Sequence, residues 1–399
     1  MKWKEQPISE VFVLKQGTYL QTEEMVESRT DEFPFAVYGA NGVVGYSTKM
    51  MYAERTPLIS CRGANCGVVH FTEPNAWVGN NSIACIPKGE VDPRFFFYQF
   101  SNSLFTDVIT GAAQPQITLT NLSPKAIVVP PIAVQRSVGD ILSAYDEAME
   151  NNRRRMGLLE KAARLLYEEW FVRLRFPGHE HTPITHGFPQ GWERKPIQEL
   201  LEFTIGGGWG GDEHDAKFTE PAFVIRGTDI PDIKVGDFTR IPNRFHVPSN
   251  LSSRKLQSGD IILEISNGNL RNIGRTLRVE AQHLLALPGD VMCASFCRML
   301  RPKGEMESQL LASHLEEMQE GGRMDFFKTP SAAGINNFRF TGLLEDEFVL
   351  IPPRALLLEF VSQVAAIRAQ LANLALQNQK LRAARDLLLP RLMSGEIEV

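Results

Sequence analysis

The residues best suited to chemistry in this chain are carboxamides and arginines, and they gather most densely between Ser266 and Arg278. An arginine can pair with guanine or with phosphate, and an asparagine can make two hydrogen bonds to the edge of an adenine. A solvated surface loop has the same composition. The stretch is therefore a candidate for contact with nucleic acid, through Asn267, Asn269, Arg271, Asn272 and Arg275.

Two further loops place carboxamide side chains among glycine, proline and alanine, at residues 111–117 and 331–337. Such side chains are candidates for reading bases, although simple turn chemistry explains these loops equally well. The candidates in the two loops are Gln114, Gln116, Asn336 and Asn337. Polar, glycine-rich loops between short predicted strands add Asn41, Arg62, Asn65, Asn80, Asn81 and Arg226.

Motifs that would support catalysis or hold a metal are missing from the sequence. The chain has no P-loop, no Gly-x-Gly-x-x-Gly fingerprint that opens a helix and no His-Glu-x-x-His motif. Asp260 and Glu264 have the spacing of a nuclease carboxylate pair, but no lysine stands two residues after Glu264. The histidines of residues 177–190 lack the cysteines or second histidine pair of a zinc site. We therefore expect a binding protein with no catalytic residue and no metal.

The elements that must position these loops are organised around two apolar heptad patterns. A seam sustained over more than four heptads predicts a helix of roughly 60 Å, which needs a partner helix to cover it. The first seam comprises Val138, Leu142, Tyr145, Met149, Asn152, Met156, Leu159, Ala163, Leu166 and Trp170. The second lies 222 residues later and comprises Phe360, Val364, Ile367, Leu371, Leu374, Asn378, Leu381, Arg385, Leu388 and Leu392.

The repeat extends beyond the helices. Trp3 leads to Gly17, and Trp192 leads to Gly206, at the same spacing and with matching Pro, Ile and Glu residues between them. This internal repeat predicts an α+β fold with two pseudo-repeated globular α/β domains separated by two long helices that are partners for each other. The predicted parts are a first domain (1–130), a first long helix (131–176), a linker (177–190), a second domain (191–351), and a second long helix with a C-terminal tail (352–399).

Composition narrows the class of protein. The 399 residues suggest at least two domains, and the net charge of −5 argues against a uniformly basic surface that grips nucleic acid alone. The start of the chain lacks the apolar core of a signal peptide, and the five cysteines show no regular framework. We expect a cytoplasmic protein without structural disulfides and without a membrane partner.

An antiparallel pairing of the two seams with aligned ends brings together residues whose numbers add up to 530. Asn152 then lies opposite Asn378, and Tyr145 lies opposite Arg385, where stacking would shelter the charge. A polar pair in an apolar seam costs stability but specifies register. We therefore expect Asn152 and Asn378 to set the register of the coiled coil.

The ends of the two helices suggest a family. The run 164–171 with Pro177-Gly178, together with residues 381–397, resembles the two helical regions of the DNA-specificity subunit of type I restriction-modification enzymes. The order of domain, helix, domain and helix extends this resemblance to the full chain, and the resemblance implies that the two long helices form an antiparallel coiled coil. It implies a subunit that recognises a bipartite DNA site, with one half-site for each domain and a spacing set by the coiled coil.

The resemblance also implies partners. Two methyltransferase (modification) subunits and motor-nuclease (restriction) subunits would assemble on this chain, with double-stranded DNA as the target. S-adenosylmethionine, ATP and magnesium would then belong to those partners, and this chain would hold no cofactor. The residues that the resemblance offers for contact with partner subunits are Tyr167, Trp170, Phe171, Leu389 and Arg391.

Two other classes of function remain open on the sequence. In the first, the chain is a non-catalytic adaptor or scaffold whose repeated domains bind protein or carbohydrate ligands. In the second, it is a self-contained enzyme with an unrecognised site. Salt-dependent binding to duplex DNA separates the specificity subunit from the adaptor, and methyl transfer by the purified chain alone would indicate an enzyme.

Overall fold

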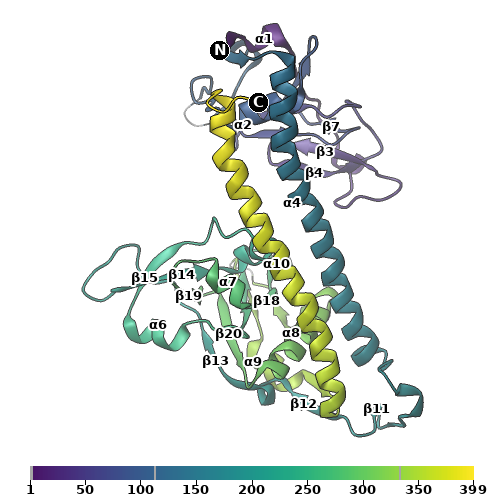
Figure 1. Cartoon of the computed structure of the whole chain (residues 1–399). Helices are drawn as coiled ribbons and strands as arrows, with labels where there is room; N and C mark the ends of the chain where they lie inside the picture. Colours follow the sequence, from purple (N-terminus) through teal and green to yellow (C-terminus); the bar gives the residue numbers. More distant parts are fainter. Residues whose placement is uncertain (1–2, 112–113, 332–333) are drawn as a thin grey trace. The chain divides into compact units, whose positions relative to one another are not determined.

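The computed structural model describes residues 3–111, 114–331 and 334–399, and the chain divides into two compact units. The first unit comprises Met1–Ala148 and Leu381–Val399, and the second comprises Met149–Lys380. Each unit combines short strands with a segment of each of two long helices (Figure 1). The predicted α+β fold class is confirmed.

The strands of the first unit form a four-stranded sheet in the order β2-β8-β5-β6, a three-stranded sheet in the order β4-β3-β7, and the pair β1-β9. The strands are β1 (Lys4–Pro7), β2 (Phe12–Gln16), β3 (Phe35–Gly39), β4 (Gly42–Ser47), β5 (Pro57–Ser60), β6 (Val69–Phe71), β7 (Trp77–Val78), β8 (Ser82–Pro87) and β9 (Ala126–Val129). The short helices are α1 (Ile8–Val11), α2 (Pro93–Ser101) and α3 (Leu119–Leu122).

Helix α2 supplies much of the core of the first unit. The side chain of Asp92 accepts a hydrogen bond from the backbone N–H of Arg94 at 2.9 Å, and a proline opens the first turn, which favours a helix start at this point. Its buried rings pack edge to face with the ring of Phe12 on β2, and the centroids of Phe12 and Phe96 lie 4.9 Å apart.

The second unit repeats this arrangement, with the sheets β13-β20-β16-β18 and β15-β14-β19 and the pair β12-β23. Its strands are β10 (Ile184–Thr185), β11 (Phe188–Pro189), β12 (Glu193–Pro196), β13 (Leu201–Gly206), β14 (Glu220–Ile225), β15 (Asn243–His246), β16 (Ile261–Glu264), β17 (Ser266–Asn267), β18 (Thr276–Arg278), β19 (Asp290–Cys293), β20 (Cys297–Pro302), β21 (Lys328–Thr329), β22 (Asn336–Phe338) and β23 (Phe348–Ile351). Its short helices are α5 (Ile230–Lys234), α6 (Pro248–Arg254), α7 (Ala281–Leu285), α8 (Glu305–Glu320) and α9 (Phe340–Asp346).

Strand register shows which residues of the two domains are equivalent. On β2, the consecutive residues Phe12 and Val13 pair with Pro87 and Ile86 of β8. On β13, Leu201 pairs with Pro302 of β20, and the next residue in register is Phe203, which pairs with Arg301. This bulge adds one residue to the second domain. The equivalent of Gly17 is therefore Gly207, and the sequence alignment of Gly17 with Gly206 was wrong by one position.

Backbone hydrogen bonds confirm the corrected alignment. The N–H of Gly17 donates to Ser82 at 2.9 Å, and the N–H of Gly207 donates to Cys297, the equivalent position on β20, at 3.0 Å. The following residues, Thr18 and Gly208, donate to Val78 and to Cys293.

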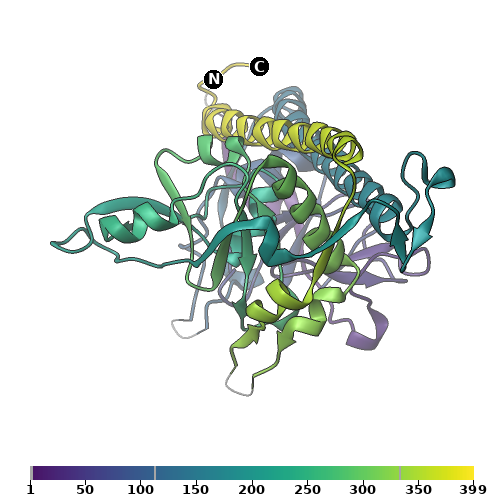
Figure 2. The same cartoon turned by 90° about the horizontal axis from the view of Figure 1, so that it is seen from below.

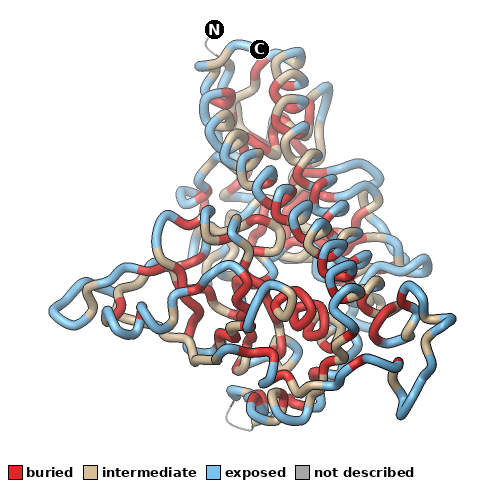
Figure 3. Tube along the Cα trace, turned by 60° about the horizontal axis from the view of Figure 1, so that its bottom comes forward, coloured by how far each residue is buried: buried red, intermediate tan, exposed pale blue. Residues whose placement is uncertain are grey.

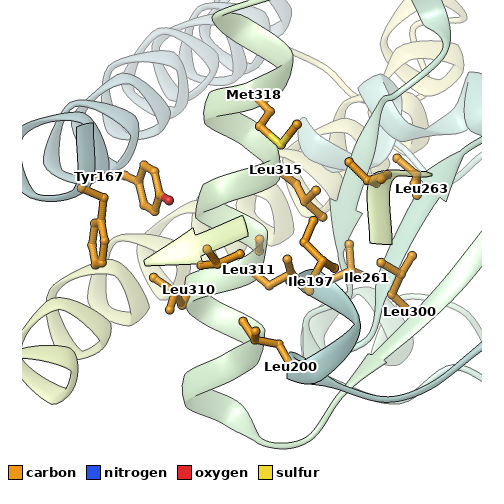
Figure 4. Packing of buried hydrophobic residues seen from close by; sticks show 14 of the residues in the cluster. Tyr167, Ile197, Leu200, Ile261, Leu263, Leu300, Leu310, Leu311, Leu315 and Met318 are labelled. Carbon is orange, nitrogen blue, oxygen red and sulfur yellow. The ribbon is translucent and has the colours of Figure 1, made fainter. Parts of the chain in front are cut away.

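Helix α8 carries the core of the second unit. In Figure 4, α8 has Tyr167 on one side and Ile261, Leu263 and Leu300 on the other. Because both faces of the helix are covered, its apolar residues Leu310, Leu311, Leu315 and Met318 are almost fully buried. The hairpin of β10 and β11 stands apart from the strands of this unit (Figures 1 and 2), and it is mostly exposed (Figure 3).

The two long helices are α4 (Ile132–Tyr167), which ends in a π-helical turn at Glu168–Val172, and α10 (Arg354–Met393). Every seam residue that the sequence predicts on them is buried or partly buried. In the first unit, Val138 and Leu142 share a core cluster with Leu388 and Leu392.

In the second unit, contacts between α4 and α10 follow the pairing in which residue numbers add up to 530. Met156 packs with Leu374 in a small cluster that also includes Leu159 and Leu371. The ring of Trp170 lies 5.6 Å from that of Phe360. Each unit thus contains a segment of an antiparallel coiled coil.

Helix α10 is the one described helix that is long and apolar enough to cross a bilayer by length and composition, with a mean hydropathy of 1.3 over eighteen residues. Its seam residues pack against other parts of the chain instead of standing free. A third of that window is buried, which leaves apolar side chains on the other faces.

Candidate nucleic-acid interface

Four loops of the first unit bring its predicted DNA-contacting residues together. The side chain of Asn65 donates a hydrogen bond to that of Asn41, in the turn between β3 and β4. The backbone N–H of Cys61 donates to the carbonyl of Asn81 at 2.8 Å, and Arg62 forms an antiparallel bridge with Gln116.

All seven candidates of this unit retain exposed surface. Asn41, Asn80 and Asn81 also line a common cavity of about 290 Å³ together with Tyr19. The exposed or partly exposed set is Asn41, Arg62, Asn65, Asn80, Asn81, Gln114 and Gln116. Ala112 and Ala113 of the predicted loop lie outside the described residues, as do Ala332 and Ala333 of its counterpart.

The asparagine-rich loop of the second unit is organised by its own side chains. The side chain of Asn267 accepts a hydrogen bond from the backbone N–H of Asn269 at 2.7 Å, and that of Asn269 accepts one from Arg271 at 3.0 Å. The amide of Asn272 lies 3.5 Å from the same oxygen of Asn267. Asn267 and Asn269 therefore shape the loop, and their side-chain oxygens already accept hydrogen bonds within it.

The loop that contains Asn336 and Asn337 pairs with this one. Strand β22 matches Asn337 with Ser266 and Asn336 with Asn267. The amide of Asn336 donates to the carbonyl of Gly268 at 3.0 Å, and the hydroxyl of Ser266 donates to the side chain of Asn337 at 3.0 Å. The structure thus brings together the two stretches of the second domain that the sequence proposed separately.

A buried carboxylate supports this paired loop. Glu264 is 2% exposed, and one of its oxygens accepts a hydrogen bond from the amide of Asn267 at 2.6 Å. Among the described residues its other oxygen has no hydrogen-bond partner. Burial raises the pKa of Glu264, while the Asn267 bond and the charge of Arg275 oppose that rise. A side chain at Gly227 would collide with the Glu264 carboxyl group, since an added Cβ would lie 2.0 Å from its carbon.

The arginines of the second unit differ in their surroundings. The guanidinium of Arg226 makes ion-paired hydrogen bonds to Asp229 and donates to the carbonyl of Arg240 at 2.9 Å, so it braces a turn. Arg271 is exposed on the loop and Arg275 is partly exposed beside Glu264. Asp260 is buried, and its carboxylate forms an ion pair with the guanidinium of Arg301, with the Oδ2 and Nη2 atoms 2.7 Å apart. Asp260 therefore has a structural partner.

The candidate surfaces of the two domains occupy equivalent positions. Strand register aligns β5 with β16, so Ser60 corresponds to Glu264 and Arg62 to Ser266. In the first domain Arg62 pairs with Gln116, and in the second Ser266 pairs with Asn337. A carboxamide residue therefore pairs with the equivalent backbone position in both domains.

The sequence missed exposed aromatic residues next to these loops. Tyr19 is 64% exposed and Trp209 is 40% exposed, and Phe296, which is equivalent to Asn81, is 53% exposed. Their neighbourhood depends on strand pairing between residues that are 67 to 101 positions apart along the chain, so no local pattern marks them.

The predicted register pair is in contact. The amide of Asn152 donates to the side-chain oxygen of Asn378 at 3.0 Å, and both residues are buried. Arg385, however, finds its counter-charge in Asp146, at 2.5 Å, and pairs also with Asp386. The carboxylate one residue after Tyr145 thus takes the role that we expected of the Tyr145 ring.

Three of the five predicted partner contacts are wrong. Tyr167, Trp170 and Phe171 are at most 5% exposed and belong to the core of the second unit. The tyrosine hydroxyl lies 2.6 Å from the Nδ1 atom of His314 on α8, and the ring of Phe171 packs on that of Phe360. Large aromatic rings at the end of α4 fill the space between helix and domain, so no partner can reach them.

The other two predicted partner contacts lie near the end of α10. Leu389 is partly buried against the core of the first unit, and Arg391 is exposed with its guanidinium 2.8 Å from Glu396. No group of three or more metal-binding side chains occurs among the described residues.

These features define a duplicated α+β protein in which equivalent loop surfaces recur in the two domains and each unit contains a segment of an antiparallel coiled coil. Residues 1–160 match the family model of the type I restriction modification DNA specificity domain.

Two relatives carry corresponding names. The specificity subunit of the type I restriction enzyme MjaIX from Methanocaldococcus jannaschii is 24% identical over 334 residues, covering 79% of this chain and 71% of that protein. The specificity subunit of the HindI enzyme from Haemophilus influenzae is 19% identical over 380 residues, covering 76% of this chain and 77% of that protein.

A solved structure shares the fold. The S subunit of a type I restriction-modification system from M. genitalium superposes with a TM-score of 0.58 at 16% identity, over 98% of this chain and 96% of that one. The resemblance predicted from the sequence is confirmed: this chain is similar to the specificity subunits of type I restriction-modification enzymes, and the family model matches residues 1–160 of its 399 residues. The expectation of a non-catalytic subunit agrees with these relatives, which are named as specificity subunits.

Proposed function

We propose that this chain recognises a bipartite DNA sequence, with one half-site read by each domain. The observation that carries the proposal is the recurrence of one surface in both domains, built from the loop after β5 or β16 and the loop that pairs with it. A duplicated surface suits a target with two similar parts. Exposed carboxamides at its edge can bond to bases, and Arg62, Arg271 and Arg275 can reach phosphate or guanine.

The long helices act in this proposal as a spacer. Domains that each read a groove must be held at a defined separation along the duplex. Rigid helices define such a separation better than a flexible linker does. The Asn152–Asn378 pair would keep the register of the spacer constant.

The partners in this proposal are methyltransferase (modification) and motor-nuclease (restriction) subunits. S-adenosylmethionine, ATP and magnesium would be bound by those subunits, so this chain needs no cofactor, and the complex would work in the cytoplasm. Exposed leucines on α4 and α10 are available to helices of a partner in each unit, in place of the buried aromatic residues. They are Leu158, Leu165, Leu358 and Leu376 in the second unit, and Leu387 in the first unit.

The decisive experiment maps adenine methylation in cells that carry this chain and its methyltransferase partner. We expect a split motif that disappears when the chain is deleted. Gln116→Ala should relax the motif in one half only, and Asn337→Ala should relax it in the other half only.

Two outcomes would favour another function. Methylation that does not depend on the chain would contradict the proposal. If the purified chain bound duplex DNA without dependence on salt, or did not bind it, the adaptor class would be preferred.

A further inference from the structure

Tyr19 and Trp209 occupy the same position in the two domains. The residues before them make the same backbone hydrogen bonds, from Thr18 to Val78 and from Gly208 to Cys293, each at 2.9 Å. Those two acceptors end the equivalent strands β7 and β19. The equivalence is hidden in the sequence because the bulge in β13 shifts the numbering by one residue.

Both positions carry a large aromatic side chain that the core does not use. Tyr19 is 64% exposed and Trp209 is 40% exposed, and neither belongs to a core cluster among the described residues. A single exposed aromatic residue needs no explanation. Two of them at one position of a repeat whose loops have otherwise diverged point to a shared task.

A close backbone approach holds each aromatic residue in place. A Cβ atom at Gly17 would lie 2.3 Å from the carbonyl oxygen of Gly79, and one at Gly207 would lie 2.1 Å from that of Ala294. Only glycine allows the chain to cross at these points. The crossing sets Tyr19 next to the loop of Asn80 and Asn81.

The neighbours of Tyr19 are the residues proposed to read bases. Tyr19 lines the cavity of about 290 Å³ that Asn41, Asn80 and Asn81 also line. In the second domain the equivalent loop ends at Phe296, whose carbonyl accepts a hydrogen bond from Ile265 at 2.8 Å, directly before the asparagine-rich stretch. Tyr19 therefore borders the candidate surface of the first domain, and Trp209 occupies the equivalent position of the second domain.

The ring of Trp209 is held in a defined orientation. The guanidinium carbon of Arg244 lies 4.5 Å from the ring centroid, and the Nε atom of Arg244 donates to the carbonyl of Trp209 at 3.0 Å. Arg244 is in turn ion-paired with Asp212. A ring fixed on one side loses little conformational entropy when a ligand covers its exposed part.

We propose that Tyr19 and Trp209 are equivalent DNA contacts, one for each half-site, in which the ring packs against the sugar and base edge of one nucleotide. The proposal rests on the proposed DNA-binding function. Because every base and sugar offers such a surface, these contacts add affinity without selecting a sequence. The carboxamides beside them carry the selection.

The test compares the full-length chain with its variants Tyr19→Ala and Trp209→Ala, each in complex with the methyltransferase partner. Binding to a duplex that contains the mapped motif is measured by fluorescence anisotropy, and methylated sites are mapped in cells. Each variant should weaken binding roughly tenfold, as loss of one aromatic contact does. The methylation motif should keep every specified base, in contrast to the effect of Gln116→Ala or Asn337→Ala.

Matched variants separate this role from a structural one. Tyr19→Phe and Trp209→Phe keep a ring and should retain most of the affinity. Leu104→Ala and Leu285→Ala remove apolar side chains that are 78% and 84% exposed at other places, and they should bind DNA like the original chain. The double variant Tyr19→Ala/Trp209→Ala should multiply the two single effects, because the residues serve separate half-sites.

Two results would overturn the inference. If the alanine variants bind the motif as tightly as the original chain does, the rings do not contact DNA. If instead a variant loses a specified base from its half-site, the ring selects sequence and our assignment is wrong. If the original chain itself does not bind a split motif, the proposed function is refuted. This outcome differs from the two results above, which concern the variants alone.

Discussion

At the scale of single residues, Glu264 connects the core of the second domain with its candidate DNA surface. It follows three buried residues of β16, faces the turn at Gly227, and fixes the amide of Asn267. Asn267 in turn holds the backbone of Asn269. The loop that we propose to contact DNA is thus shaped from beneath by a carboxylate that no DNA can reach.

The raised pKa of Glu264 predicts a pH dependence of stability. Because burial raises the pKa of the folded carboxyl above 4.5, the folded chain keeps this proton at pH values where the unfolded chain has lost it. The contribution of Glu264 to the free energy of unfolding therefore falls as the pH rises from 4.5 to the folded pKa, and is constant above it.

Replacement by glutamine removes this titration. We expect the free energy of unfolding of Glu264→Gln to decline less than that of the original chain over that pH interval, as measured by urea denaturation at a series of pH values. Glu345→Gln, at an exposed position of α9, controls for the loss of one negative charge. Parallel curves for the original chain and Glu264→Gln would show that the buried carboxyl does not titrate as inferred.

At the scale of elements, strand register and helix register decide where the functional residues lie. Because β13 contains one bulged residue, Gly207, and not Gly206, packs closely against the backbone carbonyl groups of Cys293 and Ala294. On the helices, Asn152 and Asn378 meet because α4 and α10 pair with aligned ends.

The bulge predicts a contrast between adjacent glycines. Gly207→Ala would drive a methyl group into the carbonyl oxygens of Cys293 and Ala294, whereas Gly206→Ala meets no atom within 4 Å. We expect Gly207→Ala to lower the free energy of unfolding by about 1–3 kcal/mol or more, and Gly206→Ala to change it far less. Equal effects in chemical denaturation would contradict the corrected alignment.

The buried asparagine pair predicts non-additive mutations. Asn152→Ala leaves the side chain of Asn378 without its partner in a buried site, which should cost about 1–3 kcal/mol. Asn152→Leu/Asn378→Leu should instead raise stability, because both polar groups are removed together.

A double-mutant cycle of thermal or chemical unfolding measures the coupling between the two asparagines. The single variants Asn152→Leu and Asn378→Leu complete the cycle. Additive effects of these variants would mean that the two side chains do not act as a pair.

At the scale of the whole molecule, the chain consists of two repeated units that share two continuous helices. The division falls after Ala148 on α4 and after Lys380 on α10. With a net charge of −5, the chain has no general attraction for DNA, so the function that we propose requires local surfaces and partner subunits to supply that attraction.

This arrangement predicts the effect of lengthening the helices. Seven residues inserted after Ala148 and seven after Lys380 keep the apolar seam in phase and add roughly 10 Å of helix. We expect a spacer longer by about three base pairs and two unchanged half-sites in a methylation map. Insertion into α4 alone should break the seam and destabilise the chain. An unchanged spacer in the matched variant would refute the spacer role of the helices.

The sequence alone indicated the repeated architecture and the resemblance to a known family. Heptad spacing, repeated Trp, Pro and Gly residues, and the helix-end motifs are local patterns, so they can be read without knowing which parts of the chain meet. The same spacing identified Asn152 and Asn378, because a helix gives a simple relation between number and position.

Only the tertiary structure decided which loop residues lie together and which are free. Strand pairing joins residues 266–267 to residues 336–337. Side chains of Asn267 and Asn336 make hydrogen bonds to the backbone of the loop itself. The tertiary structure also buries Tyr167, Trp170 and Phe171, which were expected at a partner surface, and exposes Tyr19 and Trp209. Burial and hydrogen bonding depend on contacts between distant segments, and residue type does not reveal them.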